Sequence, residues 1–279
     1  MRRRSLFSQV VIVLAYLPLA LAASGTETKG NAPKLTAAQI VDKNIVARGG
    51  LSAWRAVRTL ELKGRMDAGG NRRDALVIPT GGKKGIQMPQ RPAEQVQLPF
   101  VMELERGRKK RVEIQFNGQT AVQVYNGSQG WKLRPFLNRH EVENYTAEET
   151  KSAATDADLD GLLIDYVAKG EKVELAGVEP VEGRSAYKLK VTDKNGYARH
   201  VWLDADSFLE VKVEGNPRRL DGKYHPVATY LRDYRSVNGL MMPYLEETAV
   251  DGVKDREKIV IEEIVSNPKL DESRFAMPR

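Results

Sequence analysis

The feature that most constrains this chain is a series of short segments in which apolar and polar side chains alternate. In the stretch TAVQVYNGSQGWKLRPF, residues 120–136, two such segments flank the pair Asn126-Gly127. Alternation with a period of two is typical of strands that bury one face, and Asn-Gly is typical of a tight hairpin turn. We therefore expect a hairpin whose apolar face is covered by something else. That face consists of Val122, Val124, Trp131 and Leu133.

Similar segments follow one another over most of the sequence. Turn signals at Gly107 and Asn117-Gly118 separate those near the hairpin, and residues 69–99 are rich in glycine and proline, which predicts strand fragments joined by loops. The whole pattern predicts about eleven strands in an antiparallel sheet. The predicted strands are residues 59–66, 100–105, 111–116, 120–125, 130–135, 172–175, 185–192, 198–203, 208–213, 227–235, 240–250 and 257–265.

Only two regions have helical patterns. Residues 36–47 begin with the capping-box spacing of Thr36 and Gln39, and the pattern stops at Gly49-Gly50. Ser52 is positioned to cap a second short turn that carries Trp54. After a capping-box sequence at Thr146 to Glu149, we expect the second helix over residues 159–168, ending at Gly170. Its apolar stripe is Leu159, Leu162, Leu163, Tyr166 and Val167.

A sheet of this size curls, and its concave face must be covered by apolar groups. The two helical regions cover part of such a face, which leaves room for a ligand. A filled barrel or a sandwich core would show the same alternation. Because we find no internal repeat and no linker, we expect a single domain over residues 36–279.

The N-terminus predicts export. Three arginines at positions 2–4, an apolar run over residues 10–21 and small residues up to Ala23 are typical of a signal peptide over residues 1–22, and the run is short for a membrane anchor. Residues 23–35 are expected to be a flexible tail. The chain has no cysteine, so it has neither disulfides nor a lipidated cysteine. The net charge falls from +7 to 7 − 3 = +4 without the leader, and we expect no nucleic-acid partner.

No motif for catalysis or metal binding is present. His140, His200 and His225 lie in unrelated contexts without metal-ligand spacing, and no serine lies in a G-x-S-x-G motif. Asp156, Asp158 and Asp160 suggest a calcium loop, but Val167 stands where the loop needs its last acid. We therefore predict no catalytic residue, no metal and no cofactor.

The run RGRKKR, residues 106–111, is the strongest charge cluster. A run of this kind is typical of a solvated hairpin turn. The alternative is a surface that contacts anionic lipid headgroups or a membrane transporter while cargo is loaded.

Four stretches in this order resemble the LolA and LolB superfamily of periplasmic lipoprotein carriers, and in particular its larger outer-membrane lipoprotein-sorting proteins. They are AAQIVDKNIVARGG running into TLELKGRM, the central VQVYNGSQGWKLRPF, the strand pair RHVWLDADSFLEVKV, and the ending NPKLDESRFAMP. The resemblance implies an open half-barrel of about eleven antiparallel strands, with helices that cover an apolar cavity on its concave face. Carriers of this family have an arginine at the edge of the barrel that bonds to the covering helices. Arg65 lies on the first strand, but its surroundings depart from the family pattern, and residues 69–99 lengthen the chain.

The resemblance implies a monomeric periplasmic carrier. Its partners would be the acyl chains of lipoproteins or another lipid, an inner-membrane transporter and an outer-membrane acceptor. A regulatory or sensor module that recognises lipoproteins or a protein partner is the alternative, and an enzyme acting on a lipid ester is a third. Each candidate lining residue could equally be ordinary core. The candidates for the cavity are Met102, Leu104, Val112, Ile114, Val124, Trp131, Leu133, Leu162, Leu163, Tyr187 and Leu189.

Overall fold

The computed structural model describes residues 35–69, 77–80, 83–87, 95–135, 138–220 and 222–278. The expected signal peptide lies outside these residues, as does all of the expected tail except Leu35. No helix in the described part of the chain is long and apolar enough to cross a membrane.

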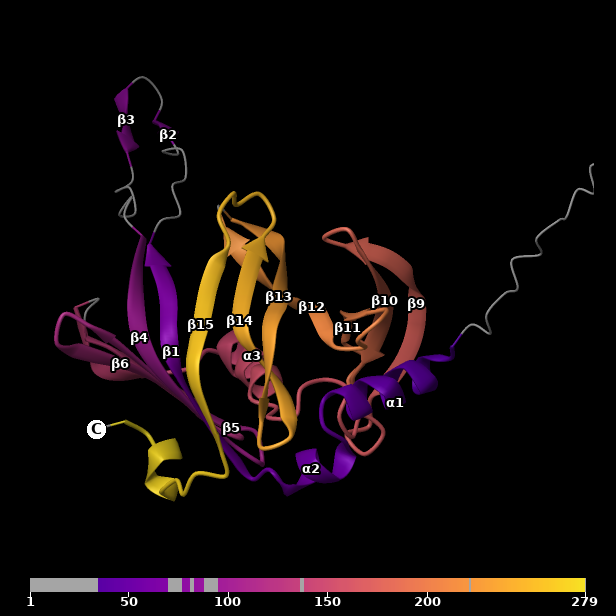
Figure 1. Ribbon diagram of the computed structural model, residues 1–279. Helices are drawn as coiled ribbons and strands as arrows, with labels where there is room; N and C mark the ends of the chain where they lie inside the picture. Colours follow the sequence, from indigo (N-terminus) through magenta and orange to yellow (C-terminus); the bar gives the residue numbers. More distant parts are fainter. Residues whose placement is uncertain are drawn as a thin grey trace, which may run out of the picture. The chain divides into compact units, whose positions relative to one another are not determined.

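The described chain forms one open antiparallel sheet of 13 strands, and β8 and β9 are its free edges (Figure 1). The order across the sheet is β8-β7-β6-β5-β4-β1-β15-β14-β13-β12-β11-β10-β9, and β2 (Val77–Thr80) and β3 (Lys83–Gln87) form a separate hairpin. The prediction of a mainly β, open antiparallel fold is confirmed. The strands of the large sheet are β1 (Thr59–Gly69), β4 (Gln95–Glu105), β5 (Lys109–Phe116), β6 (Gln119–Asn126), β7 (Gly130–Arg134), β8 (Arg139–Asn144), β9 (Lys172–Val181), β10 (Arg184–Thr192), β11 (Ala198–Asp204), β12 (Glu210–Leu220), β13 (Lys223–Val237), β14 (Leu240–Val250) and β15 (Glu257–Ser266).

One strand of this sheet was not predicted. β8 has the sequence RHEVEN, in which Val142 is the one apolar residue. An edge strand needs no apolar face when most of its side chains are in solvent, so the alternation that reveals the other strands is missing here.

The turn signals are confirmed where hairpins were expected. Asn117 and Gly118, between β5 and β6, have φ values of 49° and 73°, as a type I′ turn requires. In the next turn, the Asn126 side chain accepts hydrogen bonds from the backbone N–H groups of Ser128 and Gln129, at 3.0 and 2.8 Å. The Asn126 N–H also donates to the Gln129 carbonyl oxygen at 3.0 Å, which closes this turn.

The first helix follows the prediction, while the later ones differ from it. α1 (Ala37–Ala47) has the full capping box of Thr36 and Gln39. α2 (Leu51–Ala56) begins after Gly50, so Ser52 lies inside this helix and does not cap it.

The prediction of a helix over residues 159–168 is wrong. The capping box at Thr146 and Glu149 starts α3 (Ala147–Asp156) at once, and residues 159–170 form consecutive turns. Gly161 and Asp165 adopt positive φ, which interrupts a helix. The apolar stripe is still partly buried: Leu163 is fully inaccessible, whereas Val167 is 71% exposed. We call residues 157–170 the covering segment.

α3 connects distant parts of the sheet. Lys132 of β7 forms an ion pair with Glu149 of α3, and Asn216 of β12 donates a hydrogen bond to Ser152 of α3 at 2.8 Å. β7 and β12 are far apart in the strand order, so one short helix can reach both only because the sheet curves around it. Figure 1 shows α3 on the side toward which the sheet curves.

The apolar core lies in two clusters on this concave side. Trp54 of α2 packs with Leu60, Phe100 and Ile164 at the centre of the sheet, and all four are nearly inaccessible. A second cluster, around Leu163, lies between α1 and the strands β10 and β11. α1, α2 and the covering segment therefore fill one end of the curve.

Candidate functional site

A cleft of about 590 Å³ lies between the concave face of the sheet and the covering elements. α3 contributes Ser152, Thr155 and Asp156 to one wall, and the covering segment contributes Leu159 and Leu162. The opposite wall is the sheet itself, where apolar side chains outnumber charged ones. The apolar ones include Leu60, Leu62, Phe100, Met102, Leu104, Val213, Val227, Leu231, Met242, Pro243, Ile259 and Ile261.

The structure brings three of the eleven candidate cavity residues into this cleft: Met102, Leu104 and Leu162. Val112 lines an adjoining hollow of about 250 Å³ beneath α3. Ile114 lies opposite Phe100 on the same face and packs against the central core.

Three further candidates lie in the core beneath α1. Leu163 and Leu189 are fully inaccessible there, and Tyr187 packs against the same cluster, stacked on Phe208 with ring centroids 5.8 Å apart. They face the concave side, but α1 and the covering segment already fill the space around them.

The remaining three candidates, Val124, Trp131 and Leu133, lie on the opposite face of the sheet. Neighbouring residues of a strand point to opposite faces, and Val124 pairs with Trp131 and Arg111, while the inward residue Val112 pairs with Gln123. The partner that covers this face is the C-terminal segment, through Leu270 and Phe275. These three residues therefore form an outer cluster, separate from the cleft.

The C-terminal segment is fixed to that outer face by charges. Arg274 donates to Glu103 at 2.9 Å and pairs with Glu113 at 2.9 Å, and Arg111 donates to the Arg274 carbonyl oxygen at 2.9 Å. These arginines together hold the pKa of Glu113 below its usual range, although burial acts in the opposite direction.

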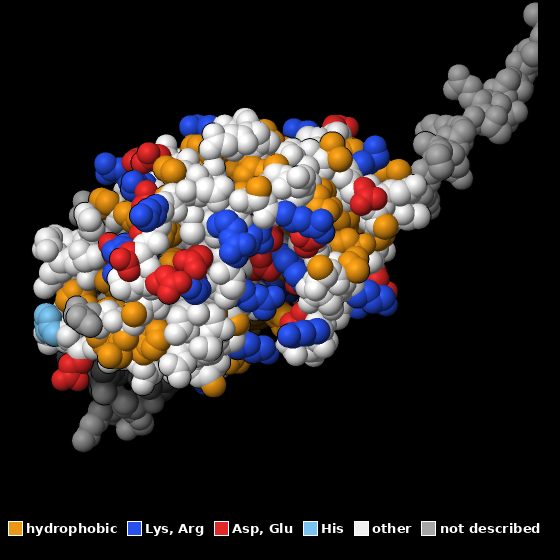
Figure 2. All heavy atoms as spheres, turned by 90° about the horizontal axis from the view of Figure 1, so that it is seen from below, with side chains coloured by type: hydrophobic (Ala, Val, Ile, Leu, Met, Phe, Trp, Pro, Cys, Tyr) orange, Lys and Arg blue, Asp and Glu red, His pale blue; other side chains and the backbone are white. Residues whose placement is uncertain are grey.

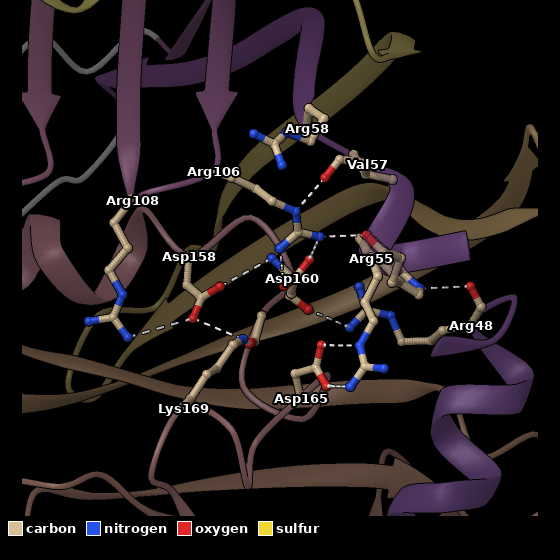
Figure 3. Close-up of polar contacts among 12 residues, drawn as sticks. Arg48, Arg55, Val57, Arg58, Arg106, Arg108, Asp158, Asp160, Asp165 and Lys169 are labelled. Atoms are coloured by element: carbon tan, nitrogen blue, oxygen red, sulfur yellow. Dashed lines mark hydrogen bonds and ion pairs between the residues drawn. The ribbon is translucent and has the colours of Figure 1, made fainter. Parts of the chain in front are cut away.

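Arg106 attaches the covering segment to the sheet (Figure 3). It lies in the turn between β4 and β5, and its guanidinium forms a two-pronged pair with the Asp160 carboxylate at 2.7 and 2.8 Å. The same group donates to the carbonyl oxygens of Trp54 and Val57. The Asp160 side chain is 4% exposed. One arginine thus joins the sheet, the end of α2 and the covering segment.

Other pairs reinforce this attachment. Asp158 accepts from Lys169 at 2.9 Å, and Arg55 of α2 forms a two-pronged pair with Asp165 at 2.6 and 2.9 Å, which lowers the pKa of Asp165. Arg48 donates to the Asp160 carbonyl oxygen at 3.0 Å. Figure 2 shows the face that carries α1 and α2 from below, with basic and acidic side chains gathered near its middle.

The charge cluster at residues 106–111 is therefore used largely within the chain. Arg106 and Arg111 bond as described, and Lys109 forms an ion pair with Glu105 at 2.8 Å. Lys110 points to the concave side, where it lines the cleft. The sequence identifies this basic run, but it does not show to which face of the sheet each of its side chains points.

Carriers of the LolA superfamily have an arginine that bonds to the covering helices. Arg65, on the first strand, does not make such bonds. It forms an ion pair with Glu262 at 3.1 Å, and both side chains are more than half exposed. Arg106 makes the contacts with the covering elements instead.

The histidines and acids form no metal centre among the described residues. His200 Nδ1 lies 2.6 Å from Glu214, and His225 Nδ1 lies 2.9 Å from the Asp251 carbonyl oxygen, each on a different strand pair. Asp158 and Asp160 are occupied by Lys169 and Arg106.

Comparison with known proteins identifies the fold. No family model and no curated protein matches the sequence. In structure, the chain is similar to a LolA superfamily protein from Nitrosomonas europaea, at 12% identity and a TM-score of 0.54, with 87% of this chain and 98% of that chain covered. It is also similar to a DUF1329 family protein from Desulfovibrio piger, at 13% identity and a TM-score of 0.53, covering 86% and 96%.

A third similar structure is a domain from Vibrio parahaemolyticus named for outer membrane lipoprotein sorting. It has 12% identity and a TM-score of 0.50, covering 85% of this chain and 94% of that one. The expected resemblance to the LolA superfamily is thus confirmed at the level of the fold.

Proposed function

We propose that the protein is a periplasmic carrier that takes up the acyl chains of lipoproteins, or of another lipid, and shields them on the way to the outer membrane. The observation that carries this proposal is the apolar cleft between the curved sheet and a covering segment held by Arg106. The fold, which the chain shares with a LolA superfamily protein, supports the same conclusion.

The energetics explain why an interior cleft suits this role. An acyl chain that leaves a bilayer loses roughly 0.8 kcal/mol per methylene group, so a soluble carrier must offer an enclosed apolar surface in return. Leu62, Met102 and Ile259 supply such a surface on the sheet side, and Leu162 supplies it on the covering side. Of the sequence candidates, Met102, Leu104 and Leu162, with Val112 in the adjoining hollow, are the cavity residues that we propose.

The rest of the proposal concerns location and partners. Residues 1–22 would direct export and be removed, and the mature monomer would meet an inner-membrane donor and an outer-membrane acceptor. No residue is assigned a catalytic role, and no cofactor is needed for binding an acyl chain.

A substitution in the cleft tests the proposal. Met102→Glu places a carboxylate on the apolar wall, where it must be desolvated when an acyl chain binds, so we expect the amount of bound lipid to fall about tenfold. The measurement is native mass spectrometry with lipid extraction, on mature protein purified from a periplasmic fraction without detergent.

The matched control is Val101→Glu. Val101 is the neighbouring residue on β4 and points to the outer face, opposite Lys63 and Glu113. This variant should retain its lipid. A wild-type chain that is empty, and stays empty after incubation with lipids and acylated peptides, would contradict the carrier and favour a regulatory module that binds a protein partner.

A further inference from the structure

The cleft contains a carboxylate without a protein partner. Glu246 lies on β14 between Leu231 of β13 and Ile259 of β15, both of which line the cleft. Within the described residues, the Glu246 carboxylate has neither a hydrogen bond nor an ion pair. Each of the other acids that line the cleft has a partner: Asp156 with Ser152, Asp158 with Lys169, Glu210 with Arg48, and Glu214 with His200.

The neighbouring residue shows that cations are available on this part of the sheet. Glu247 points to the outer face, where it accepts from Arg232 at 2.8 Å and pairs with Arg256 at 3.3 Å and Lys258 at 3.6 Å. The two adjacent glutamates thus have opposite surroundings: three cations outside and an apolar wall inside. Glu246, which points inward, has no cationic partner, although its neighbour Glu247, which points outward, has three.

One cation faces the same space. Lys110 lines the cleft and the adjoining hollow, and no ion pair within 4.0 Å joins it to Glu246 or to any other described acid. Burial raises the pKa of Glu246, and the charge of Lys110 partly opposes this, so the two groups interact without touching. Of the other cations of the cleft, Arg48 pairs with Glu210 and Arg218 with Glu257. Arg199 also lines the cleft, and Lys110 is the cation whose charge acts on Glu246.

Two separated charges of opposite sign on an apolar wall are unfavourable for the empty protein, because each is partly desolvated and neither is paired. A ligand that carried only a cation would pair with Glu246 and be repelled by Lys110, and an anion would have the reverse interactions. A ligand with both charges would satisfy both groups, and charge-assisted hydrogen bonds are the stronger kind.

We propose that the cleft selects a zwitterionic amphiphile, in which an amine binds Glu246, a phosphate binds Lys110 and the acyl chain lies along the apolar wall. An ethanolamine phospholipid has this chemistry. The inference rests on the proposed function and narrows its cargo to the second class named there, a lipid whose headgroup carries both a phosphate and an amine.

The test uses three amphiphiles with a single hydrocarbon chain of equal length: a zwitterionic lysophosphatidylethanolamine, an anionic lysophosphatidic acid and a cationic alkylammonium. Dissociation constants are measured by isothermal titration calorimetry on the mature protein after delipidation. We expect the zwitterion to bind about tenfold more tightly than either of the others, as one additional charged pair implies.

Two substitutions then test the contributions of Glu246 and Lys110 one at a time. Glu246→Gln should weaken binding of the zwitterion and the cation about tenfold and strengthen binding of the anion. Lys110→Gln should weaken the zwitterion and the anion and strengthen the cation. Because each substitution removes an unpaired charge, both variants should fold, which circular dichroism checks. The control is Glu263→Gln. Glu263 lies on β15 with its side chain 58% exposed, and this substitution should change none of the three dissociation constants.

The outcomes are distinct. Equal affinities for the three amphiphiles, or affinities that Glu246→Gln leaves unchanged, would overturn the headgroup selection while the carrier function stands. Failure of all three to bind would overturn the carrier function itself.

Discussion

Replacing Arg106 with alanine is expected to lower the free energy of unfolding by about 3–5 kcal/mol, because it leaves the buried Asp160 carboxylate without its partner. The substitution also removes the donor to the carbonyl oxygens of Trp54 and Val57. Urea denaturation followed by tryptophan fluorescence measures the change, because Trp54 lies in the core and its carbonyl oxygen accepts a hydrogen bond from Arg106.

Arg58→Ala is the matched control. Arg58 lies beside this network in Figure 3, but it is exposed, and its side chain has no bond drawn to the network. Its removal should change stability by less than about 0.5 kcal/mol. Arg106→Lys should fall between the two, because lysine keeps the charge but lacks the planar fork. If Arg106→Ala and Arg58→Ala unfold at the same urea concentration, the attachment of the covering segment by Arg106 is not a main source of stability.

Replacing Gly64 with valine is expected to destabilise the fold by about 3 kcal/mol or more, at the upper end of the cost of overpacking. A Cβ at this position would lie 2.0 Å from the Val260 carbonyl oxygen, a backbone atom that cannot move without breaking the pairing of β1 with β15. The register of the two strands shifts between Lys63 and Gly64, so the irregularity itself requires the close approach. Thermal unfolding followed by circular dichroism is the measurement.

The control for this prediction is Arg65→Val. Arg65 is the next residue on β1, and its exposed ion pair with Glu262 contributes at most about 1 kcal/mol. Valine is well suited to a strand, so the melting temperature should change little. Equal melting temperatures for the Gly64→Val and Arg65→Val proteins would mean that the β1–β15 pairing tolerates the added side chain.

The strands could be predicted because their signal is local. Alternation and turn residues such as Asn117-Gly118 are properties of a few neighbouring residues, and the structure follows them. The failure at residues 159–168 has a different cause, since an apolar stripe at helical spacing also arises when turns bury Leu163 and Ile164 through distant contacts. In that segment tertiary packing decides the backbone.

The site could be predicted only in part, because a period of two says that a strand has two faces without saying which is concave. Val124 and Met102 belong to equally regular strands, yet Val124 lies under the C-terminal segment and Met102 lies in the cleft. The same limit applies to charges. Nothing local distinguishes Glu246 from Glu247, or Lys110 from its basic neighbours, because the difference is the face to which each side chain points.

The position of β15 has a consequence for how the chain acquires its structure. β15 lies between β1 and β14, so the last strand in the sheet joins the half made of β1 and β4 to β8 to the half made of β9 to β14. While the chain is being made, β1 and β14 each keep an open edge until β15 arrives, and open edges are templates for pairing with other molecules. Contacts between such distant segments also form slowly. The two edges therefore stay open to pairing with other molecules until β15 has been added.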